Sequence, residues 1–150
     1  SAFAGNYDAT DLPFQRRKFD GFKAYGQSKL ALRMLTWGMA TRLDGSGVTA
    51  NAASPGFVRT DFNQHARGLM ATMIGLSAKL FAVPAAKGAD TPLWVAAAPE
   101  LAGATGKYFE GRKEKDGKYR DPAAIADLER RCDEMIGAAG SDARASAAPA

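Results

Sequence analysis

The sequence predicts an α/β fold in which helices flank a parallel sheet. A helix over residues 22–43, striped with apolar side chains, is followed after a glycine-rich turn by the short β-prone run 48–53. A short run of small and β-branched residues that follows a helix is typical of a buried parallel strand. Further along, a helix over 87–98 precedes a strand over 105–109. We therefore expect helices and strands to alternate along one chain.

The helix predicted over 22–43 carries two neighbouring apolar stripes. One stripe consists of Leu30, Met34 and Trp37, and the other of Leu32, Leu35, Met39 and Leu43. Two adjacent stripes indicate burial on more than one side, so we expect one to pack on the sheet and the other on a neighbouring helix or a partner subunit. The helix should end at residues 44–47, where glycine supplies a left-handed C-cap.

The helix over 87–98 contains Pro92. Proline costs about 3 kcal/mol in a helix interior but is tolerated in the first turn. Thr91 as the N-cap with Pro92 at the first helical position is the simplest start. A start near Ala85 with a kink is the alternative.

The remaining segments are predicted from composition and spacing. A polar loop covers residues 4–21, and the strand over 105–109 is expected to be the last. An amphipathic helix over 123–136 follows. Residues 137–150 consist almost wholly of Gly, Ala, Ser, Pro, Asp and Arg, which predicts a disordered tail.

Composition narrows the functional classes. The chain is 46% hydrophobic and 24% charged, as in soluble globular proteins. Its apolar runs are broken well before the roughly 20 residues that cross a bilayer, and its start does not resemble a signal peptide. We expect a cytoplasmic protein, with a membrane anchor on a preceding part left open. The net charge of +4 comes with interspersed acidic residues and no nucleic-acid motif, so no nucleic-acid partner is expected. Cys132 is the only cysteine, which rules out an internal disulfide and a thiolate metal cluster, and we expect no metal.

The motif AYGQSK at 24–29 carries the first chemical signal. It places Tyr25 and Lys29 four residues apart, so their Cβ atoms should lie about 5–6 Å apart on one helix face. A phenol is a poor base at neutral pH, and a nearby ammonium favours the phenolate by stabilising its charge. The pair therefore predicts a proton-transfer device, although the spacing alone also fits an ordinary solvated helix face.

The second motif, NAASPGFVRT at 51–60, ends the strand predicted over 48–53. Ligands of open α/β sheets bind outside the carboxyl ends of the strands, and the turn at Pro55 and Gly56 lies at such an end. A plain turn from strand to loop is the alternative interpretation.

Together with GKYF at 106–109, these motifs follow one another as in the short-chain dehydrogenases/reductases, and their context resembles the retinol-dehydrogenase-like branch. The resemblance runs from Ser1 to about Met135. It implies that residues 1–136 form the C-terminal catalytic half of a Rossmann-type, doubly wound parallel sheet with flanking helices. No Gly-x-Gly-x-x-Gly run follows an apolar strand pattern here. We therefore expect the N-terminal dinucleotide-binding half to lie outside this chain.

The resemblance implies hydride transfer between NAD or NADP and an alcohol or carbonyl. Tyr25 would be the acid/base, and Lys29 would favour its phenolate and hydrogen-bond the nicotinamide ribose. Ser1 matches the place of the family's serine, which donates a hydrogen bond to the reacting oxygen. The family's assisting asparagine should lie upstream and has no counterpart here.

The resemblance also places the nicotinamide against residues 55–60. Pro55 and Gly56 would form the turn, backbone groups near Val58 would hold the carboxamide, and Thr60 would touch the phosphate or carboxamide side. Neither the choice between NAD and NADP nor the substrate can be read from this sequence.

Residues 61–83 are rich in Met, Leu, Ala and Gly. In the family this segment covers the substrate, and flexible Met-rich surfaces suit apolar ligands, so a small apolar carbonyl or alcohol is expected. These side chains fit an ordinary amphipathic-helix core equally well. His65 is not expected to act as a base, because Tyr25 and Lys29 fill that role.

Two other functions remain open from the sequence. The chain could be a truncated, non-catalytic interaction module that pairs through the helix at 22–43. It could also belong to the epimerases and dehydratases of the wider dinucleotide-binding group, which share the Tyr-x-x-x-Lys pattern. Under the reductase interpretation, the isolated chain should bind cofactor poorly and be inactive, because the pyrophosphate site belongs to the other half.

Overall fold

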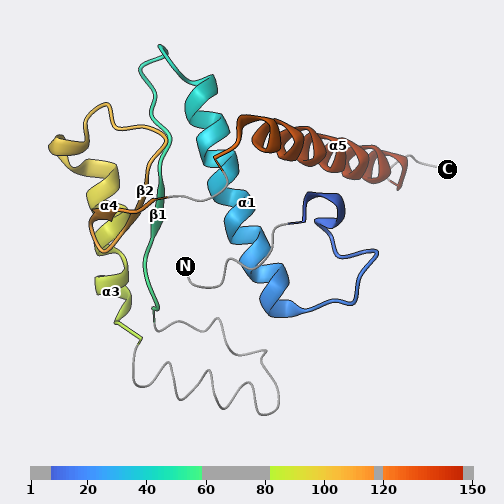
Figure 1. The fold of residues 1–150 in the computed structure, drawn as a ribbon, viewed down its shortest axis with the longest axis horizontal. Coiled ribbons are helices and arrows are strands. Elements are labelled where there is room, and N and C mark those ends of the chain that lie inside the picture. The colour runs from blue at the N-terminus through green and yellow to red at the C-terminus, as the bar shows by residue number, and fades with distance from the viewer. Residues whose placement is uncertain (1–7, 59–81, 117–119, 147–150) are drawn as a thin grey trace. The chain divides into compact units, whose positions relative to one another are not determined.

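The computed structural model describes residues 8–58, 82–116 and 120–146. The chain divides into two compact units (Figure 1). Residues 1–46 and 117–150 form a helical unit, and residues 47–116 form a sheet unit. Helices and a small mixed sheet confirm the α/β class.

The helical unit is built on α1, Gly21–Arg42, which confirms the helix predicted over 22–43. Asp20 caps its start, since its carboxylate accepts hydrogen bonds from the backbone N–H groups of Phe22 at 3.0 Å and Lys23 at 3.2 Å. Beyond its end, Gly45 has a φ of 73°, the left-handed conformation that glycine was expected to supply there.

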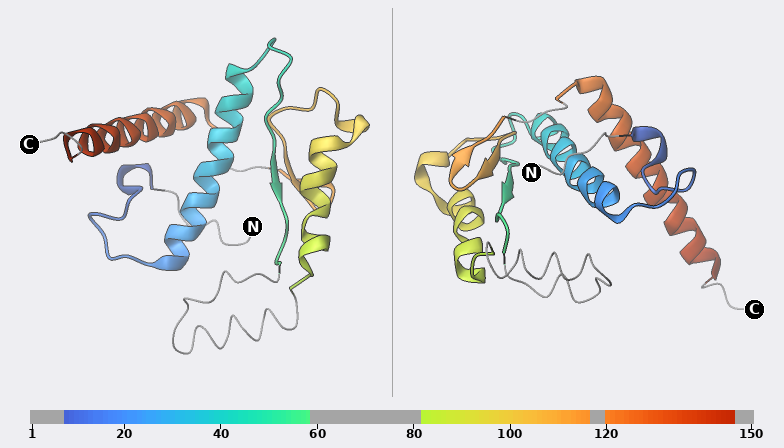
Figure 2. Two further views of the ribbon diagram at one scale, coloured as in Figure 1. Left: turned by 180° about the vertical axis from the view of Figure 1, so that it is seen from behind. Right: turned by 60° about the horizontal axis from the view of Figure 1, so that its bottom comes forward.

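The second helix of this unit, α5, spans Pro122–Ser146 and packs across α1 through its first turns (Figure 2). The sequence predicted that this helix ends at Ile136 and that residues from 137 onward are disordered. This was wrong for residues 137–146, because α5 continues to Ser146. Residues 137–146 contain several alanines and an arginine, which are good helix formers. Extending an existing helix also avoids the cost of nucleation.

The apolar core of the helical unit lies between α1 and α5. Leu30, Met34 and Trp37 pack with Ile125 and Leu128, and each of these side chains is at most 9% exposed. The first predicted stripe is therefore buried, but in this unit it packs against α5 instead of a sheet. In the second stripe, Leu32 and Met39 are exposed.

A close approach of the two helices occurs at Gly38. A Cβ atom there would lie 2.9 Å from Cγ2 of Ile125 and still closer to the carboxylate of Glu129. The same carboxylate forms an ion pair with Arg42. Glycine is therefore required for the observed packing.

The polar loop before α1 contains a short 3-10 helix, η1, at Ala9–Asp11. Asp8 caps it by accepting hydrogen bonds from the backbone N–H of Thr10 at 2.9 Å and from its hydroxyl at 2.7 Å. The loop is thus partly ordered by its own side chains.

In its described residues, the sheet unit has three short strands in the order β1-β2-β3. Strands β1, Ala52–Ser54, and β2, Tyr108–Glu110, are parallel, with Ala52 opposite Tyr108. The strand predicted over 48–53 was expected to be buried, but β1 is half-buried because it forms one edge of this sheet in the described part of the chain.

The sequence predicted that the strand over 105–109 is the last strand. This was wrong, because a further strand, β3, Lys113–Glu114, pairs antiparallel with β2. The connecting residues Gly111 and Arg112 have φ angles of 59° and 55°. Two successive positive φ angles are characteristic of the type I′ turn, which joins hairpin strands tightly.

Helices α3, Ala85–Gly88, and α4, Asp90–Ala97, precede the short η3, Pro99–Leu101. The predicted N-cap at Thr91 was wrong, and the alternative start at Ala85 with an interruption is observed. The interruption lies between Gly88 and Asp90, because the ring of Pro92 clashes with the carbonyl four residues earlier in a continuous helix. Helix α4 lies against β1 and β2.

Candidate active site

Tyr25 and Lys29 lie on one exposed face of α1, as the motif predicts. The Nζ atom of Lys29 is 5.4 Å from the centroid of the Tyr25 ring, within the range of a cation–π contact. The Tyr25 side chain is 42% exposed. The structure thus brings an ammonium beside a phenol that a substrate could reach.

Ser28, inside the same motif, has a local role. Its hydroxyl donates a hydrogen bond to the backbone carbonyl of Tyr25 at 2.8 Å. This contact ties the hydroxyl to the backbone of its own helix.

The turn after β1 presents the second group of candidate residues. Gly56 has a φ of 75°, a conformation that glycine adopts easily. Its backbone N–H donates to the hydroxyl oxygen of Ser54 at 3.2 Å, and that hydroxyl donates to the Glu110 carboxylate at 3.4 Å. Pro55 and Gly56 therefore form a defined turn at the carboxyl end of a parallel strand.

Val58 is held from two sides. It forms a parallel bridge with Val83, whose backbone N–H donates to the carbonyl of Phe57 at 2.9 Å. A Cβ atom on Gly88 would lie 2.4 Å from Cγ2 of Val58. Helix α3 can approach Val58 only because position 88 lacks a side chain.

Asn51 is a site-supporting residue whose role the motif did not reveal. Its side-chain amide donates to the carbonyl of Ala104 at 2.7 Å, and its amide oxygen accepts from the backbone N–H of Lys107 at 3.0 Å. Asn51 thus connects the start of β1 to the loop that leads into β2. An asparagine directly before a parallel strand was the available signal.

Gln27 is the second residue whose role was missed. It lies inside AYGQSK and is 4% exposed, and its amide contacts the loop before α1. A buried glutamine between Tyr25 and Lys29 could not be recognised from helical spacing, because its partners come from a loop.

Two predicted site residues, Ser1 and Thr60, lie outside the described part of the chain. His65 and most of the 61–83 segment lie outside it as well. Tyr25 and Lys29 belong to the helical unit, and the 55–58 turn belongs to the sheet unit. Among the described residues, no group of three or more His, Cys, Asp or Glu side chains is arranged to hold a metal. None of the helices in those ranges is long and apolar enough to span a membrane.

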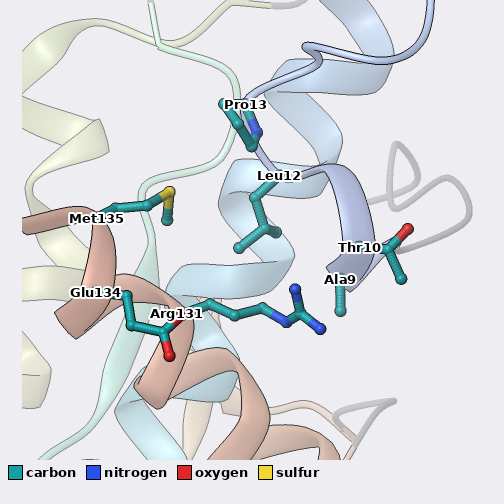
Figure 3. A pocket seen from close by; sticks show the side chains of 7 residues that line it. All are labelled: Ala9, Thr10, Leu12, Pro13, Arg131, Glu134 and Met135. Carbon is teal, nitrogen blue, oxygen red and sulfur yellow. The ribbon is translucent and has the colours of Figure 1, made fainter. Parts of the chain in front are cut away.

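A hollow of about 290 Å³ lies in the helical unit (Figure 3). It lies between the loop at η1 and the middle of α5. Its lining residues are Ala9, Thr10, Leu12, Pro13, Arg131, Glu134 and Met135. Neither Tyr25 nor Lys29 lines it.

The single thiol is poorly suited to nucleophilic chemistry. Burial raises the pKa of Cys132, and the nearby carboxylates of Asp133 and Glu129 raise it further. A thiol held in its protonated form is a weak nucleophile.

Comparison with known proteins connects these motifs to one family. The model of the family described as short chain dehydrogenase matches residues 15–69. Human retinol dehydrogenase 13 is 40% identical over 116 residues, which cover 75% of this chain and 35% of the relative. A probable oxidoreductase of Streptomyces antibioticus is 35% identical over 130 residues, covering 80% of this chain and 43% of the relative.

Mouse polyprenol dehydrogenase is 34% identical over 144 residues, which cover 93% of this chain and 43% of the relative. The chain thus spans less than half the length of these relatives. No solved structure gives a significant match. The chain belongs to the short-chain dehydrogenase/reductase family of oxidoreductases and is retinol-dehydrogenase-like.

Proposed function

We propose that this chain supplies the acid/base part of an NAD(P)-dependent oxidoreductase that interconverts an alcohol and a carbonyl. The observation that supports it best is the Lys29 ammonium 5.4 Å from the Tyr25 ring centroid, on an exposed face of a helix in an oxidoreductase family. Two relatives are named for retinol and polyprenol, which are both alcohols. An apolar alcohol or the matching carbonyl is therefore the proposed substrate.

In this mechanism the nicotinamide would accept or supply the hydride. Tyr25 handles the proton: its hydroxyl donates to the carbonyl oxygen during reduction, and its phenolate accepts the hydroxyl proton during oxidation. Lys29 stabilises the phenolate by its positive charge and would also bond the nicotinamide ribose. Ser1 is the proposed donor to the reacting oxygen.

The turn after β1 is the proposed contact for the nicotinamide. Its supporting observations are the ordered Pro55–Gly56 turn at the carboxyl end of β1 and the clamped backbone at Val58. Backbone groups near Val58 would hold the carboxamide, and Thr60 would contact the phosphate or carboxamide side. The pyrophosphate site is proposed to lie in the part of the relatives that this chain does not span, so the chain alone should be inactive.

Replacing Lys29 tests whether its positive charge assists Tyr25. In the full-length polypeptide that carries this sequence, Lys29→Met should lower turnover by roughly tenfold or more, because the charge that develops on the Tyr25 oxygen loses a neighbouring positive charge. Lys23→Met is the matched control, since Lys23 is an exposed lysine of the same helix. Its turnover should stay within about twofold. Equal turnover in the two variants would overturn the proposed role of Lys29.

A further inference from the structure

The turns of α1 that carry Tyr25 and Lys29 lie outside the apolar core. The buried apolar side chains of α1 begin at Leu30, where packing against α5 starts. Between Gly21 and Lys29, the buried residues are Gly26 and Gln27. Because glycine has no side chain, Gln27 is the one buried side chain in this described stretch, and it is hydrogen-bonded to the preceding loop.

Gln27 makes four hydrogen-bond contacts with the preceding loop. Its amide oxygen accepts from Nη2 of Arg17 at 2.8 Å and from the backbone N–H of Asp8 at 3.2 Å. Its amide nitrogen donates to the carbonyls of Leu12 at 3.3 Å and Asp11 at 3.5 Å. Both ends of the amide are used, so an apolar side chain of the same size would leave several polar groups without these partners.

The loop that Gln27 contacts is itself held together by a buried carboxylate. Asp11 is 5% exposed, and its side chain accepts from the backbone N–H groups of Gln15 at 2.7 Å and Arg16 at 3.2 Å. Nε of Arg17 lies 3.5 Å from the same carboxylate, and Nη1 lies 3.3 Å from the Asp8 carboxylate. Arg17 therefore joins the loop carboxylates to Gln27.

The face of α1 that Gln27 occupies is opposite to the Tyr25 face. At 3.6 residues per turn, two positions are separated by roughly 200° around the helix. A contact that fixes the direction of Gln27 therefore also fixes the direction of Tyr25, and Lys29 follows because it lies four residues from Tyr25. The loop supports the pair from behind.

We propose that Gln27 is a positioning residue, which through Arg17 and the Asp11 loop sets the rotation of the α1 turns that carry Tyr25 and Lys29. The expected effect of Gln27 on turnover rests on the proposed function, whereas the anchoring of α1 by Gln27 does not. The anchoring and the chemistry can therefore be tested separately.

Amide hydrogen exchange of the full-length polypeptide tests the anchoring. In Gln27→Met, the amides of residues 24–29 should exchange roughly tenfold faster or more, because local opening no longer breaks this network. The amides of residues 34–42, beside the apolar core, should be unchanged. Ser28→Ala is the control for the same turn and should leave both groups of amides unchanged. Exchange that is unaltered by Gln27→Met, or that rises equally along all of α1, would overturn the proposal.

Kinetics test the consequence for the site. A misplacement of about 1 Å can cost roughly 100-fold in rate, so Gln27→Met should lower kcat by roughly 10- to 100-fold. The KM for the carbonyl substrate and the Kd for the nicotinamide should stay within about twofold of the wild-type values. Gln27→Glu, which keeps the acceptor for Arg17, should recover part of the lost kcat.

Arg17→Met should lower kcat as much as Gln27→Met does. The double variant Arg17→Met/Gln27→Met should lose no more kcat than either single variant, because both substitutions disrupt the same hydrogen-bond network. Loss confined to KM, or fully additive losses, would contradict the positioning role. If hydride transfer does not depend on Tyr25 at all, the proposed function fails, while the exchange result still decides whether Gln27 anchors the helix.

Discussion

Tyr25 and Lys29 lie on an exposed helix face that is supported from behind by a polar network, whereas the 55–58 turn is held by backbone pairing and a close glycine contact. In the helical unit the apolar core begins one residue after Lys29, at Leu30. In the sheet unit the ladder between β1 and β2 leads directly into the turn. The difference indicates that the helical unit can lose core stability without losing the local order of the candidate pair, whereas the sheet unit cannot lose its packing without disturbing the turn.

The largest expected change comes from the core of the helical unit. Leu128 is fully buried between α1 and α5, so Leu128→Ala should lower the free energy of unfolding by about 2–5 kcal/mol. Leu32→Ala is the matched control, because Leu32 is 56% exposed, and it should change stability by at most about 0.5 kcal/mol. Urea denaturation measures both.

Because the α1 turns that carry Tyr25 and Lys29 are held by the polar network, Leu128→Ala should keep turnover per folded molecule near the wild-type value. A loss of turnover as large as the loss seen with Gln27→Met would show that the core, and not the polar network, positions the pair.

The next largest change concerns the sheet unit. Gly88→Ala places a Cβ atom against the Val58 side chain, and such overpacking costs about 1–3 kcal/mol. Because Val58 belongs to the turn itself, this variant should also weaken nicotinamide binding in the full-length protein, as measured by titration. Gly137→Ala, where a Cβ atom meets open space on α5, is the control and should leave binding unchanged. If the Gly88→Ala protein is destabilised but binds the nicotinamide normally, the packing of α3 on Val58 does not determine the shape of the 55–58 turn.

The smallest expected effects come from exposed ion pairs in each unit. Hydrogen bonds from Arg131 and then Arg130 lower the pKa of Asp127, and a hydrogen bond from Arg112 lowers that of Asp90. A carboxylate whose pKa is lowered by folding stabilises the folded state above its ordinary pKa of 3.8 and loses that contribution as the pH falls through the lower, folded value.

The urea midpoint of the wild-type protein should therefore fall between about pH 6 and pH 3, and the fall should be slightly smaller in Asp127→Asn and Asp90→Asn. An equal fall in all three proteins would show that neither ion pair contributes to stability.

Local signals made much of the helical unit predictable. The bounds of α1 followed from apolar spacing and from the glycines after its end, and the stripe of Leu30, Met34 and Trp37 is the stripe that is buried. The Tyr25 and Lys29 pair lies on one face because four residues make about one helical turn. These features depend on neighbours within a few positions, which a sequence displays directly.

Features that depend on distant partners were missed. Gln27 is anchored by a loop up to 19 positions away, and Asn51 contacts residues 53 and 56 positions further on. The hairpin of β2 and β3 uses Gly111 and Arg112 in place of the commoner Asn-Gly pair. The roles of Gly38 and Gly88 require knowledge of which side chain approaches them, and spacing along the chain does not contain that information.

The most direct test of the account is the turnover of Tyr25→Phe in the full-length polypeptide, measured with both nicotinamides and with binding of the nicotinamide measured in parallel. Removing one hydroxyl should lower turnover by roughly 10²- to 10⁴-fold, the contribution of a positioned acid/base group, while the Kd for the nicotinamide stays within about twofold. Turnover close to the wild-type level would contradict the assignment of Tyr25 as the acid/base and, with it, the proposed function of this chain.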